Sequence, residues 1–109
     1  MTPQQAWTSI LNNLEEKTIE LPTVPKTKKI PVWFSASTNG EIVFINEASD
    51  HKPSSKLSVP RILRYNTFQK VFPFYLRREN GEPVSSKVTA ITVNQVYYFS
   101  LIKDFCYKE

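Results

Sequence analysis

A long stretch of basic side chains offers the clearest chemistry in this sequence of 109 residues. No acidic residue lies between Asp50 and Glu79, whereas seven basic residues do. They are Lys52, Lys56, Arg61, Arg64, Lys70, Arg77 and Arg78. Cations of one sign set up a positive potential, and on binding a nucleic acid they release its condensed counterions. The stretch therefore predicts affinity for a polyanion, unless acids from elsewhere in the fold neutralise it.

Aromatic side chains are interleaved with these cations. Exposed rings stack on nucleobases and contribute about 1–3 kcal/mol for each base. Phe68, Phe72 and Tyr75 repeat at helical spacing, so we expect them in the core, while Tyr65 is a candidate for stacking. A polar loop between two prolines adds three more lysines. The predicted nucleic-acid site comprises Lys26, Lys28, Lys29, Lys52, Lys56, Arg61, Arg64, Tyr65, Lys70, Arg77 and Arg78.

Groups that could carry out catalysis are scarce. Cys106 is the only cysteine and His51 the only histidine, which excludes an intramolecular disulfide and a structural zinc site. The two glycines are too few for a glycine-rich phosphate loop. Cys106 lies among apolar and aromatic residues, which is typical of a buried thiol, and His51 is interpreted as an exposed loop residue. We therefore expect no catalytic residue and no cofactor.

The acidic residues offer one candidate for a metal site. Glu47 and Asp50 lie near Lys52, and a minimal Mg²⁺-dependent nuclease would need carboxylates grouped in this way. Two carboxylates without a third ligand are too few, so we predict no metal site. The acids that follow the N-terminal segment are interpreted as a solvated helix end; they are Glu15, Glu16 and Glu20.

The N-terminal segment predicts an amphipathic helix over about residues 3–17. Thr2 and Gln5 have the spacing of a capping box, and Pro3 suits the first helical position. Apolar residues then recur at intervals of three and four, which places them on one face. This stripe consists of Trp7, Ile10, Leu11 and Leu14.

The centre of the chain predicts β-structure. Asn39-Gly40 separates residues 32–36 from 42–45, and both runs are rich in apolar β-formers. This pattern predicts a hairpin with a type I′ turn, in which both central residues have positive φ. Residues 19–21 indicate an earlier short strand, and residues 57–63 a later one that Pro60 interrupts.

Two further segments complete the expected fold. Asn66 is predicted to cap a helix that ends after Arg77 and Arg78, where Asn80-Gly81 resembles a helix C-terminus. Pro73 is expected to kink or split this helix. Residues 88–102 fit either two strands or two short helices. We favour helices capped by Ser85 or Ser86 and by Thr92, as a unit like a helix-turn-helix with Asn94, Gln95 and Tyr98 near the start of its second helix.

Together these elements predict one small α+β domain over residues 1–109, with a basic central segment over 52–78. An N-terminal amphipathic helix precedes a central antiparallel sheet and a helical C-terminal half, with an all-strand C-terminus as the alternative. The start of the chain lacks the apolar run of a secretory signal, and residues 96–102 are too short for a membrane span. We expect a cytoplasmic protein with no membrane partner.

The function predicted from the residues is non-catalytic nucleic-acid binding through the phosphate backbone, with little sequence specificity. We expect DNA rather than RNA as the ligand. A chain this short suits an accessory subunit of a larger partner, such as a polymerase, primase or helicase. The alternative is a protein–protein interaction module without direct nucleic-acid contact, because Trp, Tyr and Arg also dominate protein interfaces. The third hypothesis is the minimal Mg²⁺-dependent nuclease.

Overall fold

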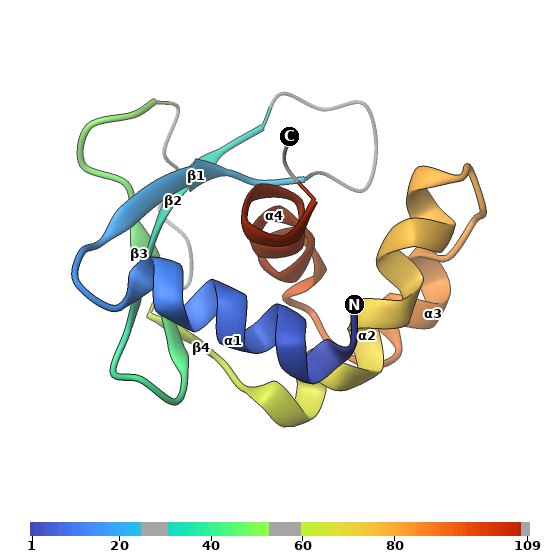
Figure 1. Cartoon of the computed structure of the whole chain (residues 1–109). Helices are drawn as coiled ribbons and strands as arrows, with labels where there is room; N and C mark the ends of the chain where they lie inside the picture. The colour runs from blue at the N-terminus through green and yellow to red at the C-terminus, as the bar shows by residue number, and fades with distance from the viewer. Residues whose placement is uncertain (25–30, 53–59, 108–109) are drawn as a thin grey trace.

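In the part of the chain that the structure describes, four helices lie on one side of a four-stranded sheet (Figure 1). The computed structural model describes residues 1–24, 31–52 and 60–107. The strands form an antiparallel sheet in the order β1-β2-β3-β4, and the predicted α+β class with a helical C-terminal half is confirmed. In chain order the elements are α1 (Pro3–Leu14), β1 (Ile19–Pro22), β2 (Trp33–Thr38), β3 (Val43–Glu47), β4 (Arg61–Leu63), α2 (Tyr65–Glu79), α3 (Ser85–Thr89) and α4 (Gln95–Cys106).

Helix α1 begins as its sequence predicts. The Thr2 hydroxyl accepts a hydrogen bond from the backbone N–H of Gln5, and the Gln5 side chain accepts one from the backbone N–H of Thr2. This capping box satisfies two of the N–H groups that a helix start leaves open. The helix ends at Leu14, three residues earlier than predicted, because Leu14 is the last residue of the buried stripe.

The central hairpin forms, but its turn is longer than predicted. Strands β2 and β3 pair from Phe34 opposite Glu47 to Thr38 opposite Val43, which leaves a four-residue loop. The Asn39 side-chain oxygen accepts the N–H groups of Glu41 and Ile42. Gly40 has φ +99°, but Asn39 does not have a positive φ, because in the described ranges only glycines do. The type I′ prediction is therefore wrong, because side-chain hydrogen bonds stabilise the wider loop instead.

Helix α2 differs from its prediction in two ways. Arg64, not Asn66, is its N-cap residue, and its carbonyl accepts the N–H of Phe68. The helix is continuous through Pro73, although proline lacks the N–H for one hydrogen bond and its ring crowds the carbonyl of Gln69. Pro73 is exposed, so water can solvate the carbonyl left without a partner, while buried residues on the opposite face hold both halves in place. Proline therefore does not split this helix.

The end of α2 matches the predicted asparagine–glycine stop. Gly81 has φ +87° and donates its N–H to the carbonyl of Arg78, and the N–H of Glu82 bonds to the carbonyl of Arg77. These two hydrogen bonds form a Schellman motif, which satisfies the last carbonyls of the helix.

The C-terminal half contains helices α3 and α4, as favoured, but their predicted caps are wrong. Val84 and Asn94 are the N-cap residues, and neither makes a side-chain capping bond. The Thr92 hydroxyl accepts the N–H of Asn94, so it shapes the turn before α4 rather than the first turn of the helix. Six consecutive residues of α4, 97–102, are buried.

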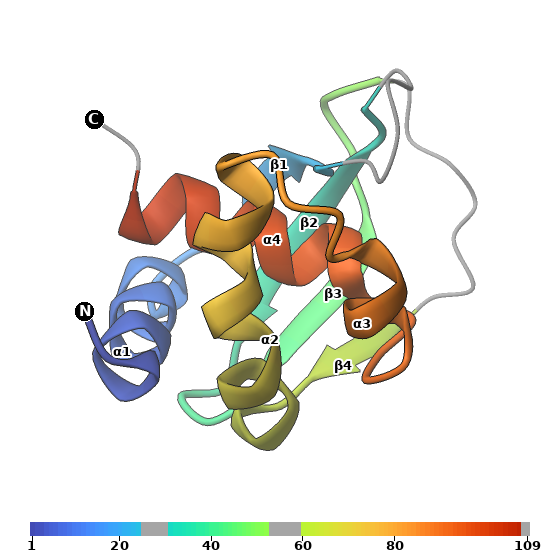
Figure 2. The same ribbon diagram turned by 90° about the vertical axis from the view of Figure 1, so that its right-hand side faces the viewer.

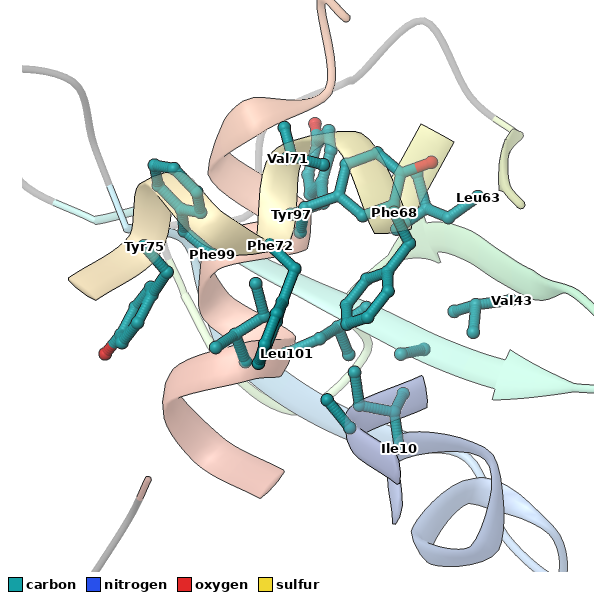
Figure 3. Packing of buried hydrophobic residues seen from close by; sticks show 14 of the residues in the cluster. Ile10, Val43, Leu63, Phe68, Val71, Phe72, Tyr75, Tyr97, Phe99 and Leu101 are labelled. Atoms are coloured by element: carbon teal, nitrogen blue, oxygen red, sulfur yellow. The ribbon is translucent and has the colours of Figure 1, made fainter. Parts of the chain in front are cut away.

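Helix α4 is the centre of the core, with the sheet and the helices α1 and α2 around it (Figure 1). Figure 3 shows Phe68 and Phe72 reaching from α2 into the cluster that Ile10 of α1 and Leu101 of α4 share. A helix surrounded in this way needs apolar side chains on nearly every side. This explains why the sequence of α4 is rich in the aromatic and β-branched residues that are also common in strands.

Candidate nucleic-acid interface

The structure describes seven of the eleven predicted site residues. Arg61 lies in β4, Arg64 caps α2, and four others lie within α2. Lys52 is exposed in the loop after β3. The four in α2 are Tyr65, Lys70, Arg77 and Arg78, while Lys26, Lys28, Lys29 and Lys56 lie outside the described residues.

One face of α2 points away from the core. Its buried residues lie on the opposite side, so the positions about 180° from them face solvent. Lys70 and Arg77 share this surface, two helical turns and about 10 Å apart along the axis. We call this surface the outer α2 face; it consists of Asn66, Gln69, Lys70, Pro73, Leu76 and Arg77.

The two arginines near the end of α2 have acidic neighbours at the surface. Arg77 Nε lies 3.2 Å from a carboxylate oxygen of Glu82, and Arg78 Nη1 lies 3.1 Å from one of Glu79. All four side chains are partly exposed, and exposed ion pairs contribute only about 0–1 kcal/mol. Both arginines can therefore exchange a carboxylate for a phosphate at small cost. The Arg77 guanidinium also lies 5.1 Å from the ring centre of Phe74.

Arg61 serves the fold rather than this face. Its Nη1 donates to the side-chain oxygen of Asn94 at 2.8 Å, and its guanidinium carbon lies 5.9 Å from the ring centre of Tyr97. These contacts link β4 to the start of α4. The structure therefore directs Arg61 toward α4 and leaves Arg64 as the exposed cation at the N-terminal end of α2.

The aromatic rings of the basic stretch are mostly unavailable for stacking on a base. Phe68, Phe72 and Tyr75 are buried, as predicted. Tyr65 is half-buried, with its ring centre 6.3 Å from that of Trp7. Tyr98 is buried, and its hydroxyl accepts the backbone N–H of Arg64. The predicted stacking role of Tyr65 stays a prediction, and cations dominate the α2 surface.

Three polar residues that the sequence places near the start of the second helix of the C-terminal unit are buried or bound within the fold. Gln95 is 1 % exposed and Tyr98 2 % exposed, while the Asn94 side chain binds Arg61. Helix α4 therefore does not act as a recognition helix. Sequence reasoning assigned Asn66 to a helix cap and gave Gln69 no role, although positions 66, 70, 73 and 77 lie on one face of the helix.

Glu20 is also placed differently from its interpretation as a solvated helix end. It lies in β1, its side chain is 13 % exposed, and its carboxylate accepts the backbone N–H groups of Ser49, Asp50 and His51. His51 Nδ1 lies 2.8 Å from Glu20 Oε1, and the imidazole stacks on Trp33 with ring centres 4.0 Å apart. Glu20 thus anchors the loop after β3, from which Lys52 projects.

This anchor predicts a specific acid sensitivity. The His51 hydrogen bond, followed by the three backbone N–H groups, outweighs desolvation and lowers the pKa of Glu20 from 4.5 to about 2. A carboxyl whose pKa is lower in the folded state contributes stability that is complete above pH 4.5 and is lost as the pH falls toward 2. We expect Glu20→Gln to unfold at lower urea concentration at pH 7 and to lose less additional stability between pH 4.5 and 2.5. Equal losses of stability between pH 4.5 and 2.5 in wild type and variant would contradict this prediction. Glu16→Gln, at an exposed position, is the control.

Among the described residues, the remaining candidates for chemistry are the Cys106 thiol and the acidic side chains. Burial raises the pKa of the Cys106 thiol to about 11, which keeps it protonated at neutral pH. In the part of the chain that the structure describes, no three His, Cys, Asp or Glu side chains are grouped to hold a metal ion. None of the described helices is long and apolar enough to cross a membrane.

Comparisons with protein-family models, with curated proteins and with solved structures find no match to this chain.

Proposed function

We propose that this chain is a non-catalytic nucleic-acid-binding protein that holds a phosphate backbone with α2, and that DNA is its ligand. In this proposal it acts as an accessory subunit of a larger enzyme that processes nucleic acids, such as a polymerase, primase or helicase. The observation that carries the proposal is the set of cations on and beside the outer α2 face. They are Arg64, Lys70, Arg77 and Arg78.

The surroundings of these cations favour a polyanion. Residues 60–78 contain five basic residues and no acidic one. Residues 1–14 contain no charged side chain, and α1 packs beside α2, where the rings of Trp7 and Phe68 lie 4.8 Å apart. Helix α1 therefore adds no carboxylate that would repel phosphates approaching α2.

A salt titration tests the proposal. Fluorescence anisotropy of a labelled 20-base-pair DNA duplex is measured with the full chain at several salt concentrations. With about four phosphate contacts, counterion release predicts an affinity loss of about 100-fold between 50 and 200 mM salt. A loss smaller than about threefold, or no binding at 50 mM salt, would contradict the proposal.

A protein-interaction module is the second candidate. A groove of about 940 Å³ lies between β1 and α4, and three of its wall residues are the aromatic Trp33, Tyr75 and Tyr107. Aromatic side chains of this kind commonly anchor a partner protein. Under this candidate, wild-type protein shows no salt-dependent DNA binding, and Trp33→Ala releases a stoichiometric partner that wild type retains at high salt.

A further inference from the structure

The outer α2 face carries side chains that can recognise base edges as well as phosphates. Gln69 Nε2 donates to Asn66 Oδ1 at 3.0 Å, a bond that does not use the amide nitrogen of Asn66 or the amide oxygen of Gln69. The bond links the two side chains and leaves one amide donor and one amide acceptor that it does not use, the two kinds of group that adenine N7 and N6 require.

The shape and position of α2 suit the major groove of a duplex. The groove is about 12 Å wide and admits one α-helix, and the 15 residues of α2 form a rod about 22 Å long. Figure 2 shows α2 on the near side of the molecule, with α1 and α3 on either side of it. Arg64 lies at its N-terminal end and Arg77 near its C-terminal end, where phosphates would flank the groove, whereas the Arg78 guanidinium lies 5.8 Å from the ring centre of the buried Phe99.

The composition of this face argues against a single strand as the ligand. Proteins that hold single strands combine cations with exposed rings on which the bases stack. Three of the rings of α2, those of Phe68, Phe72 and Tyr75, are buried. The other two are half-buried, Tyr65 against Trp7 and Phe74 under the Arg77 guanidinium. Leu76 is a large apolar side chain on the outer α2 face and is 49 % exposed. An aliphatic group of this kind can contact a thymine methyl.

We infer that the outer α2 face enters the major groove of double-stranded DNA, with Asn66 and Gln69 at base edges and Arg64, Lys70 and Arg77 at phosphates. This inference rests on the proposed function. It adds duplex specificity and a base preference to backbone binding.

The test selects sequences from a randomised library of 20-base-pair duplexes bound by the full chain, at a salt concentration where wild type binds. Wild type is expected to enrich a short motif, with about tenfold discrimination against its mismatches. Asn66→Ala/Gln69→Ala is expected to abolish most of this discrimination, while its affinity for unselected duplex stays within about threefold. Both positions are exposed, and a matching thermal unfolding midpoint establishes that the variant folds.

A matched control and two competitors complete the experiment. Gln4→Ala/Asn12→Ala removes two exposed amides from α1 and is expected to leave the motif unchanged. Methyl green, which occupies the major groove, is expected to displace the protein, whereas netropsin in the minor groove is not. Salt-dependent binding without a motif, displacement by netropsin alone, or equal affinity for single strands would overturn this inference and leave the proposed function standing. Failure of wild type to bind any DNA would overturn both.

Discussion

Replacing Lys70 and Arg77 together by alanine is expected to weaken binding to a DNA duplex by about 100-fold at 50 mM salt. Each phosphate contact contributes roughly a tenfold gain at this salt concentration relative to 1 M, because a condensed counterion is released. Two lost contacts therefore multiply to about two orders of magnitude. Both side chains lie on the outer α2 face, so their loss leaves the core unchanged. Titrations of the labelled duplex at 50, 100 and 200 mM salt give the affinity and its salt slope.

The control for this double variant removes two positive charges at positions away from α2. Lys17 follows α1 and Lys103 lies on α4 beside the β1–α4 groove, and both are exposed. We expect Lys17→Ala/Lys103→Ala to retain affinity within about threefold and to keep the wild-type salt slope. Equal losses in the two pairs would show that net charge alone drives binding, and the assignment to α2 would fail.

Phe68→Ala lowers the free energy of unfolding by about 3–5 kcal/mol, the range for removal of a large buried aromatic side chain. Phe68 is fully buried, and its ring contacts the rings of Trp7, Phe72 and Tyr98 from three helices. The substitution leaves a cavity where α1, α2 and α4 meet. Because a domain of this size has only about 5–15 kcal/mol of stability, the variant loses a large fraction of it.

Urea unfolding followed by the fluorescence of the buried Trp7 measures this change. Leu76→Ala on the same helix is the comparison, because its side chain is half-exposed and its loss is expected to cost about 0.5 kcal/mol or less. A loss below about 1 kcal/mol for Phe68→Ala would show that the helices do not share the core described above.

Local patterns account for the elements that were predicted correctly. The capping box of Thr2 and Gln5, the stripe from Trp7 to Leu14 and the glycine stop at Gly81 depend on residues within a few positions of each other. Their hydrogen bonds and side-chain periodicity can therefore be predicted from short segments of the sequence. The burial of Phe68, Phe72 and Tyr75 follows from the same helical period.

Local preference was an incomplete guide where distant groups compete with it. Residues 95–106 are rich in β-formers, yet they form a helix because they lie between a sheet and two other helices. Asn66 has the chemistry of a cap, but the N-cap of α2 lies two residues earlier, at Arg64, where the Tyr98 hydroxyl binds the backbone. The contact spans 34 residues, and no short window contains it.

The sequence alone determined the α+β class, the basic character of residues 52–78 and the face of each amphipathic helix that enters the core, because these properties depend on composition and short-range period. Tertiary structure alone decided which cations face outward. It directed Arg61 toward Asn94, 33 residues away, and bound Glu20 to His51, 31 residues away, while Lys70 and Arg77 remained at the surface. The physical reason is that a buried polar side chain points toward the hydrogen-bond partner that folding brings within reach. For Arg61 and Glu20 that partner lies far away in the sequence, so a local pattern does not reveal it.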